Sequence, residues 1–172
     1  MIVDIPTIET ERLVLRAWRD DDLDAYAAMC GNAEFARFFG KPLDRAEAWR
    51  QLCENLGHWE LRGFGLWAVE EQATGALVGR VGLYRPEGWP GLEVGWGLDP
   101  AVWGRGYATE GGRASLDFAW TVLGADRVIS IIDPANTRSI AVAERLGETF
   151  ERRWRLRTVP VVIYGIDRPG AR

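Results

Sequence analysis

Cysteine and histidine are scarce in this sequence. Its 172 residues include two cysteines, Cys30 and Cys53, and one histidine, His58. Two cysteines are too few for a disulfide framework, and their spacing does not match a Cys-x-x-Cys motif. A single histidine leaves little for a histidine-rich metal site or for a cysteine–histidine nucleophile pair. We therefore expect a site with no metal ion.

Positive charge and long apolar runs are limited as well. Lys41 is the only lysine, and the formal net charge is −4. Proteins that bind the phosphate backbone draw most of their affinity from clustered positive charge, so nucleic acid is not an expected partner. No apolar run approaches the roughly 18 residues of a membrane span, and the first residues do not resemble a secretory signal. We expect a cytoplasmic protein with no membrane partner.

The composition is that of a folded domain. Hydrophobic residues make up 47% and charged residues 27% of the chain, both close to globular averages. A chain of this length buries roughly 70% of its unfolded surface. We therefore predict one domain over residues 1–172, with no internal repeat and no linker.

Hydrophobic periodicity predicts a mixed α/β fold. Strands are expected over residues 12–16, 66–71, 77–84, 92–98 and 127–132, with two more between 149 and 166. Helices are expected after Asp20–Asp22, over residues 44–61, between the Gly-rich turn at 104–108 and Gly124, and over residues 136–146. The order strand, helix, strand, helix in the second half predicts a parallel pairing through a crossover, added to an antiparallel meander.

A glycine-rich turn separates a predicted strand from a predicted helix. It reads Gly104-Arg-Gly-Tyr-Ala-Thr109. Glycines let backbone N–H groups turn toward a ligand, and a helix N-terminus adds unpaired donors, so this segment favours an anion such as a pyrophosphate. A P-loop is excluded because no Gly-Lys-Ser/Thr occurs. A plain turn without a ligand is the alternative.

The strand over residues 92–98 presents two different faces. Leu92, Val94, Trp96 and Leu98 alternate with Glu93, Gly95 and Gly97. Glycine weakens a strand unless something approaches the backbone closely, so the glycine face favours a ligand groove beside a carboxylate. The alternatives are an exposed Glu93 on a poorly packed strand, or a bulge that exchanges the two faces.

Two polar residues open an otherwise apolar stripe on the helix over residues 136–146. Asn136 and Ser139 precede Val142, Ala143 and Leu146 on it. Each polar residue has a simpler interpretation, Asn136 as a helix N-cap and Ser139 as a locally bonded hydroxyl. Ser139 is not expected to be a triad nucleophile, because His58 is the sole candidate base.

Three motifs in this order resemble the GNAT superfamily of acyl-CoA-dependent N-acetyltransferases. They are Glu93-Val-Gly-Trp-Gly-Leu-Asp-Pro100, Trp103-Gly-Arg-Gly-Tyr-Ala-Thr-Glu110 and Asn136-Thr-Arg-Ser-Ile-Ala-Val-Ala-Glu-Arg-Leu-Gly147. The opening Thr10-Glu-Arg-Leu-Val-Leu-Arg16 is similar to the Rim-type branch, which acetylates ribosomal-protein N-termini. The resemblance covers residues 10–166 and implies a single acyl-CoA N-acyltransferase domain. It also implies a mostly antiparallel sheet of about seven strands and about four helices, splayed at a central parallel pair.

The resemblance also implies a site for acetyl-CoA. The backbone of residues 104–108 would take the pyrophosphate, the strand at 96–98 would pair with the pantetheine arm, and Asn136 would hold the arm from the other side. The implied cofactor-binding residues are Trp96, Gly97, Leu98, Trp103, Gly104, Arg105, Gly106, Tyr107, Ala108, Thr109, Asn136 and Ser139.

The implied reaction is direct attack of a primary amine on acetyl-CoA in a ternary complex. Glu93 would accept the amine proton, and Ser139 would donate a hydrogen bond to the departing sulfur. Two departures bear on these roles, because Ala143 stands where several members carry a tyrosine acid and Glu148 replaces the usual phenylalanine. A non-catalytic acyl-CoA-binding regulatory module of the same fold is the alternative.

The acceptor and the assembly are the least defined features. A protein N-terminus or a small-molecule amine fits the chemistry, since an α-amine has a reference pKa near 7.7–8.0 and needs less help than a lysine. Early helices and late strands would line the acceptor pocket with Tyr26, Phe35, Phe38, Phe39, Trp89 and Trp154. The chain is expected to be a monomer or a homodimer.

Overall fold

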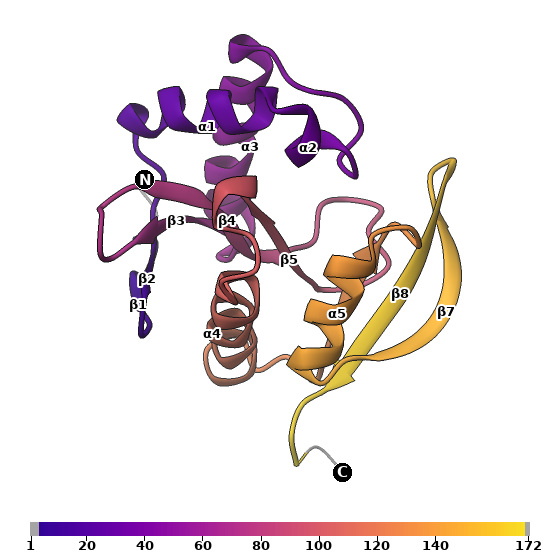
Figure 1. Ribbon diagram of the computed structural model, residues 1–172. Helices are drawn as coiled ribbons and strands as arrows, with labels where there is room; N and C mark the ends of the chain where they lie inside the picture. The colour runs from indigo at the N-terminus through magenta and orange to yellow at the C-terminus, as the bar shows by residue number, and fades with distance from the viewer. Residues whose placement is uncertain (1–3, 171–172) are drawn as a thin grey trace.

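The computed structural model describes residues 4–170, which form one sheet of eight strands with helices on both faces (Figure 1). The strand order is β1-β2-β3-β4-β5-β6-β8-β7. The strands are β1 (Ile8–Glu9), β2 (Leu13–Arg16), β3 (Leu66–Glu71), β4 (Leu77–Tyr84), β5 (Glu93–Leu98), β6 (Arg127–Ile132), β7 (Thr149–Leu156) and β8 (Val159–Asp167). The α-helices are α1 (Leu23–Gly31), α2 (Ala33–Ala36), α3 (Arg45–Arg62), α4 (Tyr107–Thr121) and α5 (Thr137–Leu146).

The predicted fold class is confirmed, and the element list gains two short members. The two-residue strand β1 and the four-residue helix α2 were not expected from the sequence. The prediction that the fourth helix ends at Gly124 is wrong by three residues. The helix ends at Thr121, and Gly124 instead takes a left-handed conformation (φ 63°) in the turn that leads to β6.

The sheet opens between its two central strands. Every neighbouring pair is antiparallel except β5 and β6, which run parallel and share one pair in register, Glu93 with Ile129. On its other side β5 pairs with β4 over its whole length, from Glu93 to Leu98. The end of β5 is therefore held on one side only, which is the predicted splay.

The helices cover opposite faces of this sheet, with α1 and α3 on one side and α4 and α5 on the other (Figure 1). Adjacent residues of β4 show the division. Arg80 bonds to Tyr26 of α1, whereas Val81 packs against Gly111 of α4. Among residues 4–170, no helix has the length and apolar content that crossing a membrane requires.

Candidate active site

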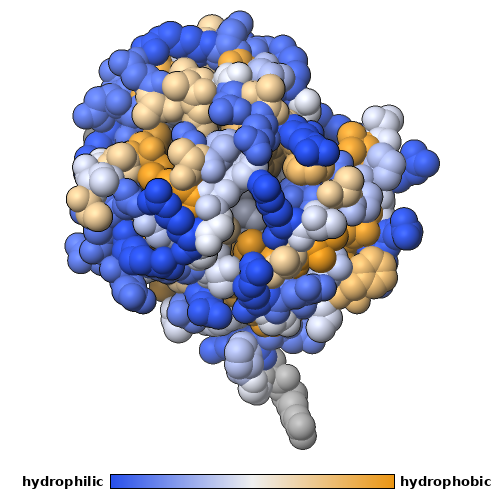
Figure 2. Space-filling model, viewed as in Figure 1, coloured by the Kyte–Doolittle hydropathy of each residue, from blue (hydrophilic) through white to orange (hydrophobic). Residues whose placement is uncertain are grey.

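A groove of about 1640 Å³ lies where the sheet opens. It is lined by residues 8–12, the segment around α2, the end of β5, the turn before α4, and one side of α4 and of α5. In the view of Figure 2, apolar patches on this face of the molecule are framed by hydrophilic side chains. The groove contains all twelve residues that the resemblance assigns to the cofactor and brings them together from three separate segments.

The backbone of Trp96 faces the opening. On the edge of β5 that points away from β4, the Val94 carbonyl accepts from the Ser130 hydroxyl (3.0 Å), and the Leu98 carbonyl accepts from the Trp103 indole (2.8 Å). Backbone groups of alternate strand residues point the same way. The N–H and C=O of Trp96, midway between these two residues, therefore point into the gap that β6 has left.

The turn before α4 presents the glycine geometry expected of an anion site. Gly104 (φ 78°) and Gly106 (φ 84°) both take left-handed conformations, and Gly106 is the N-cap of α4. A side chain is strained in this region, whereas glycine is not. Free N–H groups at a helix N-terminus attract anions.

Arg12 holds this turn from the other end of the chain. Its guanidinium donates to the Arg105 carbonyl (2.8 Å) and forms an ion pair with Glu110 (2.6 Å). Glu110 also accepts from the Thr10 hydroxyl (2.6 Å). Because its members are separated by about a hundred residues, this clamp has no local pattern in the sequence.

Two residues of the turn direct their side chains away from the groove. The Tyr107 hydroxyl (2.6 Å) and the Arg105 guanidinium (3.1 Å) both donate to Glu71 at the end of β3. The Tyr107 hydroxyl, first among several causes, holds the pKa of Glu71 below its ordinary value. Both residues thus anchor the turn, and only their backbone groups remain directed toward a ligand.

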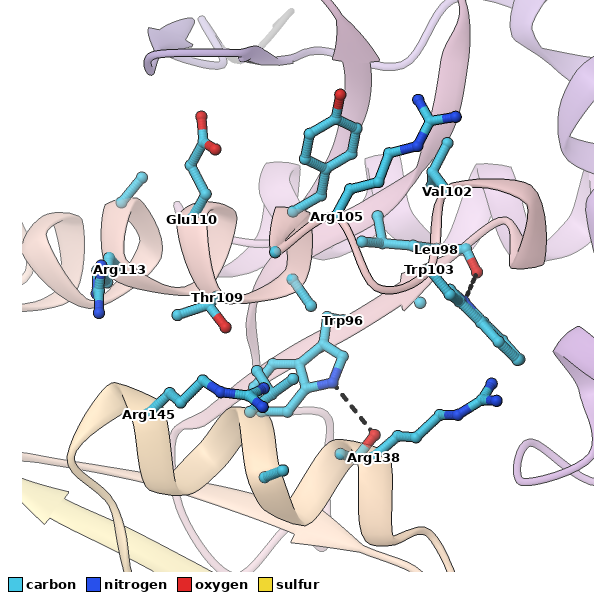
Figure 3. Close-up of a pocket in the computed structure, with 18 of the residues that line it drawn as sticks. Trp96, Leu98, Val102, Trp103, Arg105, Thr109, Glu110, Arg113, Arg138 and Arg145 are labelled. Carbon is cyan, nitrogen blue, oxygen red and sulfur yellow. Dashed lines mark hydrogen bonds between the residues drawn. The ribbon is translucent and has the colours of Figure 1, made fainter.

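Four further arginines line the groove, and the sequence did not identify them. They are Arg37, Arg113 on α4, and Arg138 and Arg145 on α5, the last three of which are labelled in Figure 3. The Arg138 guanidinium lies 4.7 Å from the centroid of the Trp103 ring, a cation–π contact. These arginines place positive charge along the groove, although the whole chain is acidic.

The helix N-cap interpretation of Asn136 is confirmed. Its side-chain oxygen accepts from the Ser139 N–H (3.2 Å), so its amide NH₂ group remains for another partner. The Ser139 hydroxyl accepts from the Trp96 indole (3.2 Å; Figure 3). Because that bond uses a lone pair of the oxygen, the hydroxyl proton of Ser139 is left to donate.

Glu93 lies at the base of the opening and does not line the groove. Its carboxylate accepts from the Trp89 indole (2.5 Å) and from the Ile131 N–H (3.4 Å). Burial raises its pKa to about 7, against these hydrogen bonds and the attraction of Arg80. The alternative of an exposed carboxylate therefore does not hold, and Glu93 has a pKa suited to exchanging a proton at neutral pH.

A second buried carboxyl group lies nearby. Glu148 is 2% exposed, and burial raises its pKa to about 8. Its Oε1 lies 2.9 Å from the Ser130 hydroxyl, and its Oε2 has no hydrogen-bond partner within residues 4–170. The residue that departs from the family pattern is thus part of the floor of the opening.

These features fit an acyl-CoA molecule. The glycine turn and the helix N-terminus suit a pyrophosphate, and the unpaired backbone of Trp96 suits the amides of a pantetheine arm. The arginines suit the phosphate group of the acyl-CoA that is not part of the pyrophosphate. The observation that carries the fit is the Trp96 edge, because a strand edge without a strand partner offers its N–H and C=O groups to another hydrogen-bonding chain.

Comparisons with known proteins agree with this geometry. The family model described as acetyltransferase (GNAT) domain matches residues 12–149. An acetyltransferase structure from Agrobacterium tumefaciens is 32% identical, with a TM-score of 0.87 and 96% of each chain covered. An uncharacterized N-acetyltransferase, YoaA of Bacillus subtilis, is 27% identical over 83% of this chain and 82% of its own length.

A solved RimL structure, a ribosomal L7/L12 α-N-protein acetyltransferase in complex with coenzyme A, shares the fold. Its TM-score is 0.79 at 19% identity, over 94% of this chain and 98% of that one. The family model covers most of the chain, and the alternative of a non-catalytic module is not favoured. The chain belongs to the GNAT acetyltransferase family and is an N-acetyltransferase that uses acetyl-CoA.

Proposed function

We propose that the chain acts as one domain over residues 1–172 and acetylates a primary amine by direct attack in a ternary complex. The acceptor is a small-molecule amine or a protein N-terminus. The observation that supports this most strongly is the Trp96 edge of β5, which opens beside the glycine turn and the N-terminus of α4. Acetyl-CoA, when bound, supplies the thioester carbonyl that the amine attacks.

Glu93 is the proposed acceptor of the amine proton. With a pKa of about 7, a substantial fraction of this carboxyl group is ionised at neutral pH. A primary α-amine has a reference pKa of about 7.7–8.0, close enough for transfer without a large barrier. Because Glu93 does not line the groove, we propose that one water molecule carries the proton to it.

Ser139 and the β5 backbone are proposed to act on the other atoms of the thioester. The Ser139 hydroxyl keeps a proton to donate toward the departing sulfur, since it accepts from Trp96. An N–H group on the Trp96–Leu98 edge is placed to polarise the carbonyl oxygen. Asn136 is proposed to hold the arm through its free amide group.

An acetylation screen tests this function. The chain is incubated with acetyl-CoA and a panel of amino acids, polyamines and short peptides with free N-termini, while thiol release and the mass of each product are measured. We expect acetylation of at least one amine class with one thiol released per product. Binding of CoA without turnover on any amine would support the binding-module alternative instead.

A further inference from the structure

Arg80 is a buried cation without a carboxylate partner. It lies on β4 directly opposite Gly97 of β5 and is 9% exposed. Among residues 4–170 it forms no ion pair, and its hydrogen bonds run from Nη1 to the Tyr26 hydroxyl (2.6 Å) and to Gln51 Oε1 (2.7 Å). Removing a charge from water is costly unless an opposite charge compensates it.

The side chains that hydrogen-bond to Arg80 are neutral. Burial raises the pKa of Tyr26 to about 12, and Tyr26 donates its hydroxyl proton to Gln51. Burial also raises the pKa of the Cys30 thiol. Glu93 feels the Arg80 charge but accepts its own hydrogen bonds from Trp89 and Ile131. No side chain in the described part of the protein therefore supplies the missing anion in contact with Arg80.

The unused edge of the guanidinium is the one that binds carboxylates best. Nη1 is engaged, so the Nε–H and Nη2 donors remain, and together they form the two-pronged edge of the guanidinium group. Within residues 4–170, only Asn55 Nδ2 and Glu148 Oε2 are fully buried without a hydrogen-bond partner. The remaining Arg80 donors therefore keep some contact with solvent.

This edge faces the glycines of β5. A Cβ atom at Gly97 would lie 3.4 Å from Arg80 Nε and 3.3 Å from the ring edges of Phe35 and Phe39. At Gly95 a Cβ atom would meet only the Glu93 carboxylate, 3.8 Å away. On this face of the sheet, Glu93, the open position at Gly95 and Arg80 beside Gly97 follow one another along β5. Alternate residues of a strand are roughly 7 Å apart.

We infer that the acceptor is an amine that also carries a carboxylate, which binds the Nε–Nη2 edge of Arg80 while the amine lies over Gly95 beside Glu93. The inference rests on the proposed function and specifies its substrate class. The spacing favours small amino acids over long polyamines, whose positive charge Arg80 would repel. Phe39, 53% exposed and with its ring centroid 5.2 Å from the guanidinium, forms the outer wall.

Matched pairs of acceptors test the inference. Amino acids are compared with their own carboxamides, at saturating acetyl-CoA, through kcat/KM. At neutral pH the carboxamide has more free amine, so any preference for the acid must come from the protein. We expect a preference on the order of 10- to 100-fold, the range of a charge-assisted pair of hydrogen bonds. Equal values for acid and carboxamide would overturn the inference.

Three variants test whether Arg80 is the source of the preference for the acid over the carboxamide. Arg80→Met should reduce it to about one and act mainly on KM, while its melting temperature stays equal or rises because a buried unpaired charge is removed. Gln51→Glu keeps Arg80 but gives it an internal carboxylate, and should also abolish the preference. Arg50→Met, an exposed arginine next to Gln51, is the matched control and should leave the ratio unchanged. A preference that survives Arg80→Met excludes Arg80 as the ligand.

A binding measurement separates this inference from the proposed function. The Nε–Hε resonance of Arg80, assigned by its loss in Arg80→Met, is followed by NMR as glycine or glycinamide is added in the presence of CoA. A shift with glycine and none with glycinamide supports the carboxylate site even if no amine is acetylated. The absence of a shift with any amino acid of the panel contradicts it even if amines are acetylated.

Discussion

At the residue scale, two carboxyl groups with raised pKa values stand out at the base of the opening. Glu93 lies on β5 and Glu148 directly before β7, and desolvation is the main cause of both shifts. Neither forms an ion pair among the residues that the structure describes. Such pairs are common where proton transfer occurs. Their different contacts lead to different predictions.

Glu93→Gln is expected to slow acetylation by about 10²–10⁴-fold, the usual effect of losing a general base. The parent rate should rise as the pH passes about 7, where Glu93 ionises. In the variant this rise should be absent, and the remaining rate should follow the ionisation of the amine, so the deficit shrinks at high pH. The pH–rate profiles of both proteins, with CoA affinity from calorimetry, provide the measurement.

Ser139→Ala is the companion variant. It should lower the acetylation rate less than Glu93→Gln does, because a thiolate with a reference pKa near 8.5 leaves without full protonation. Its effect should not change with pH across neutrality, since no titrating group is removed. If the profile of Glu93→Gln superimposes on that of the parent, the proton goes to another acceptor.

Burial favours the protonated form of Glu148, against the hydrogen bonds that Ser130 offers it. Ser130 has one hydroxyl proton but two acceptors in reach, the Val94 carbonyl (3.0 Å) and Glu148 Oε1 (2.9 Å). If Glu148 is neutral, it donates to Ser130, and Ser130 donates to Val94. This chain of bonds joins β6 to β5 just beyond their one backbone pair in register.

Glu148→Gln is therefore expected to stabilise the protein near neutral pH. Unfolded, Glu148 titrates near 4.5, and folded near 8, so between these values only the folded state keeps the proton and the free energy of unfolding falls as the pH rises. In Glu148→Gln the free energy of unfolding should not fall in this way, because the amide does not titrate. Its advantage over the parent should grow from pH 5 to pH 8 to about 2–4 kcal/mol in urea unfolding.

The control for this measurement is Glu87→Gln, since the side chain of Glu87 is 99% exposed. An exposed carboxyl group should change the stability by less than about 0.5 kcal/mol. Parent and Glu148→Gln curves that run parallel from pH 5 to pH 8 would show that Glu148 is ionised in the folded protein.

At the scale of elements, the turn before α4 is the part on which cofactor binding depends most. Gly106→Glu is expected to lower CoA affinity by more than 100-fold, because it places a side chain at φ 84°, 3.4 Å from Arg12, and a negative charge at the anion site. Calorimetry with CoA measures the affinity. Undiminished CoA affinity would show that the pyrophosphate binds elsewhere.

A matched substitution separates strain from binding. Gly75→Glu also places a side chain at a left-handed position (φ 70°), in the turn between β3 and β4, which does not line the groove. It should lower the melting temperature and leave CoA affinity within twofold. Loss of affinity in both variants would indicate a general loss of folded protein.

The sequence predicted elements well where their pattern repeats. Strands β3 to β6 are mostly apolar runs of six to eight residues, whereas β1 and α2 are too short to show a pattern. The glycine pair in α4 weakens a helix by roughly 1 kcal/mol per residue, but the structure shows its use. Cβ atoms at Gly111 and Gly112 would lie 2.8 Å from Val81 and Leu146, so the glycines let α4 approach β4 and α5.

The site was predictable only in its local parts. The twelve cofactor residues lie within three short motifs, so neighbours in sequence are neighbours in the groove. Contacts between distant residues were not accessible, such as Arg12 with Glu110 or Arg80 with Tyr26. A pattern shows that an arginine lies on a strand, but only packing shows that it is buried without a counter-ion.

At the scale of the whole molecule, the sheet has two parts that share one strand pair in register. Strands β1 to β5 form one part with α1 to α4, and β6, β8 and β7 form the other with α5. Between them lie the Glu93–Ile129 pair, the Ser130 bridge and the contacts between α4 and α5. A ligand in the groove contacts both parts and adds bonds where the sheet has fewest.

CoA binding is therefore expected to stabilise the junction more than the rest of the fold. At 100 times its Kd, a ligand adds about 2.7 kcal/mol to the free energy of unfolding. In hydrogen exchange, protection should increase at Trp96 to Leu98, in the turn at 104–108 and in the first turn of α5. The hairpin of β7 and β8 beyond Arg153 lies outside the groove and should exchange at the same rate with and without CoA. Protection confined to α1 and α3 would place the ligand on the opposite face and contradict the assignment of the groove.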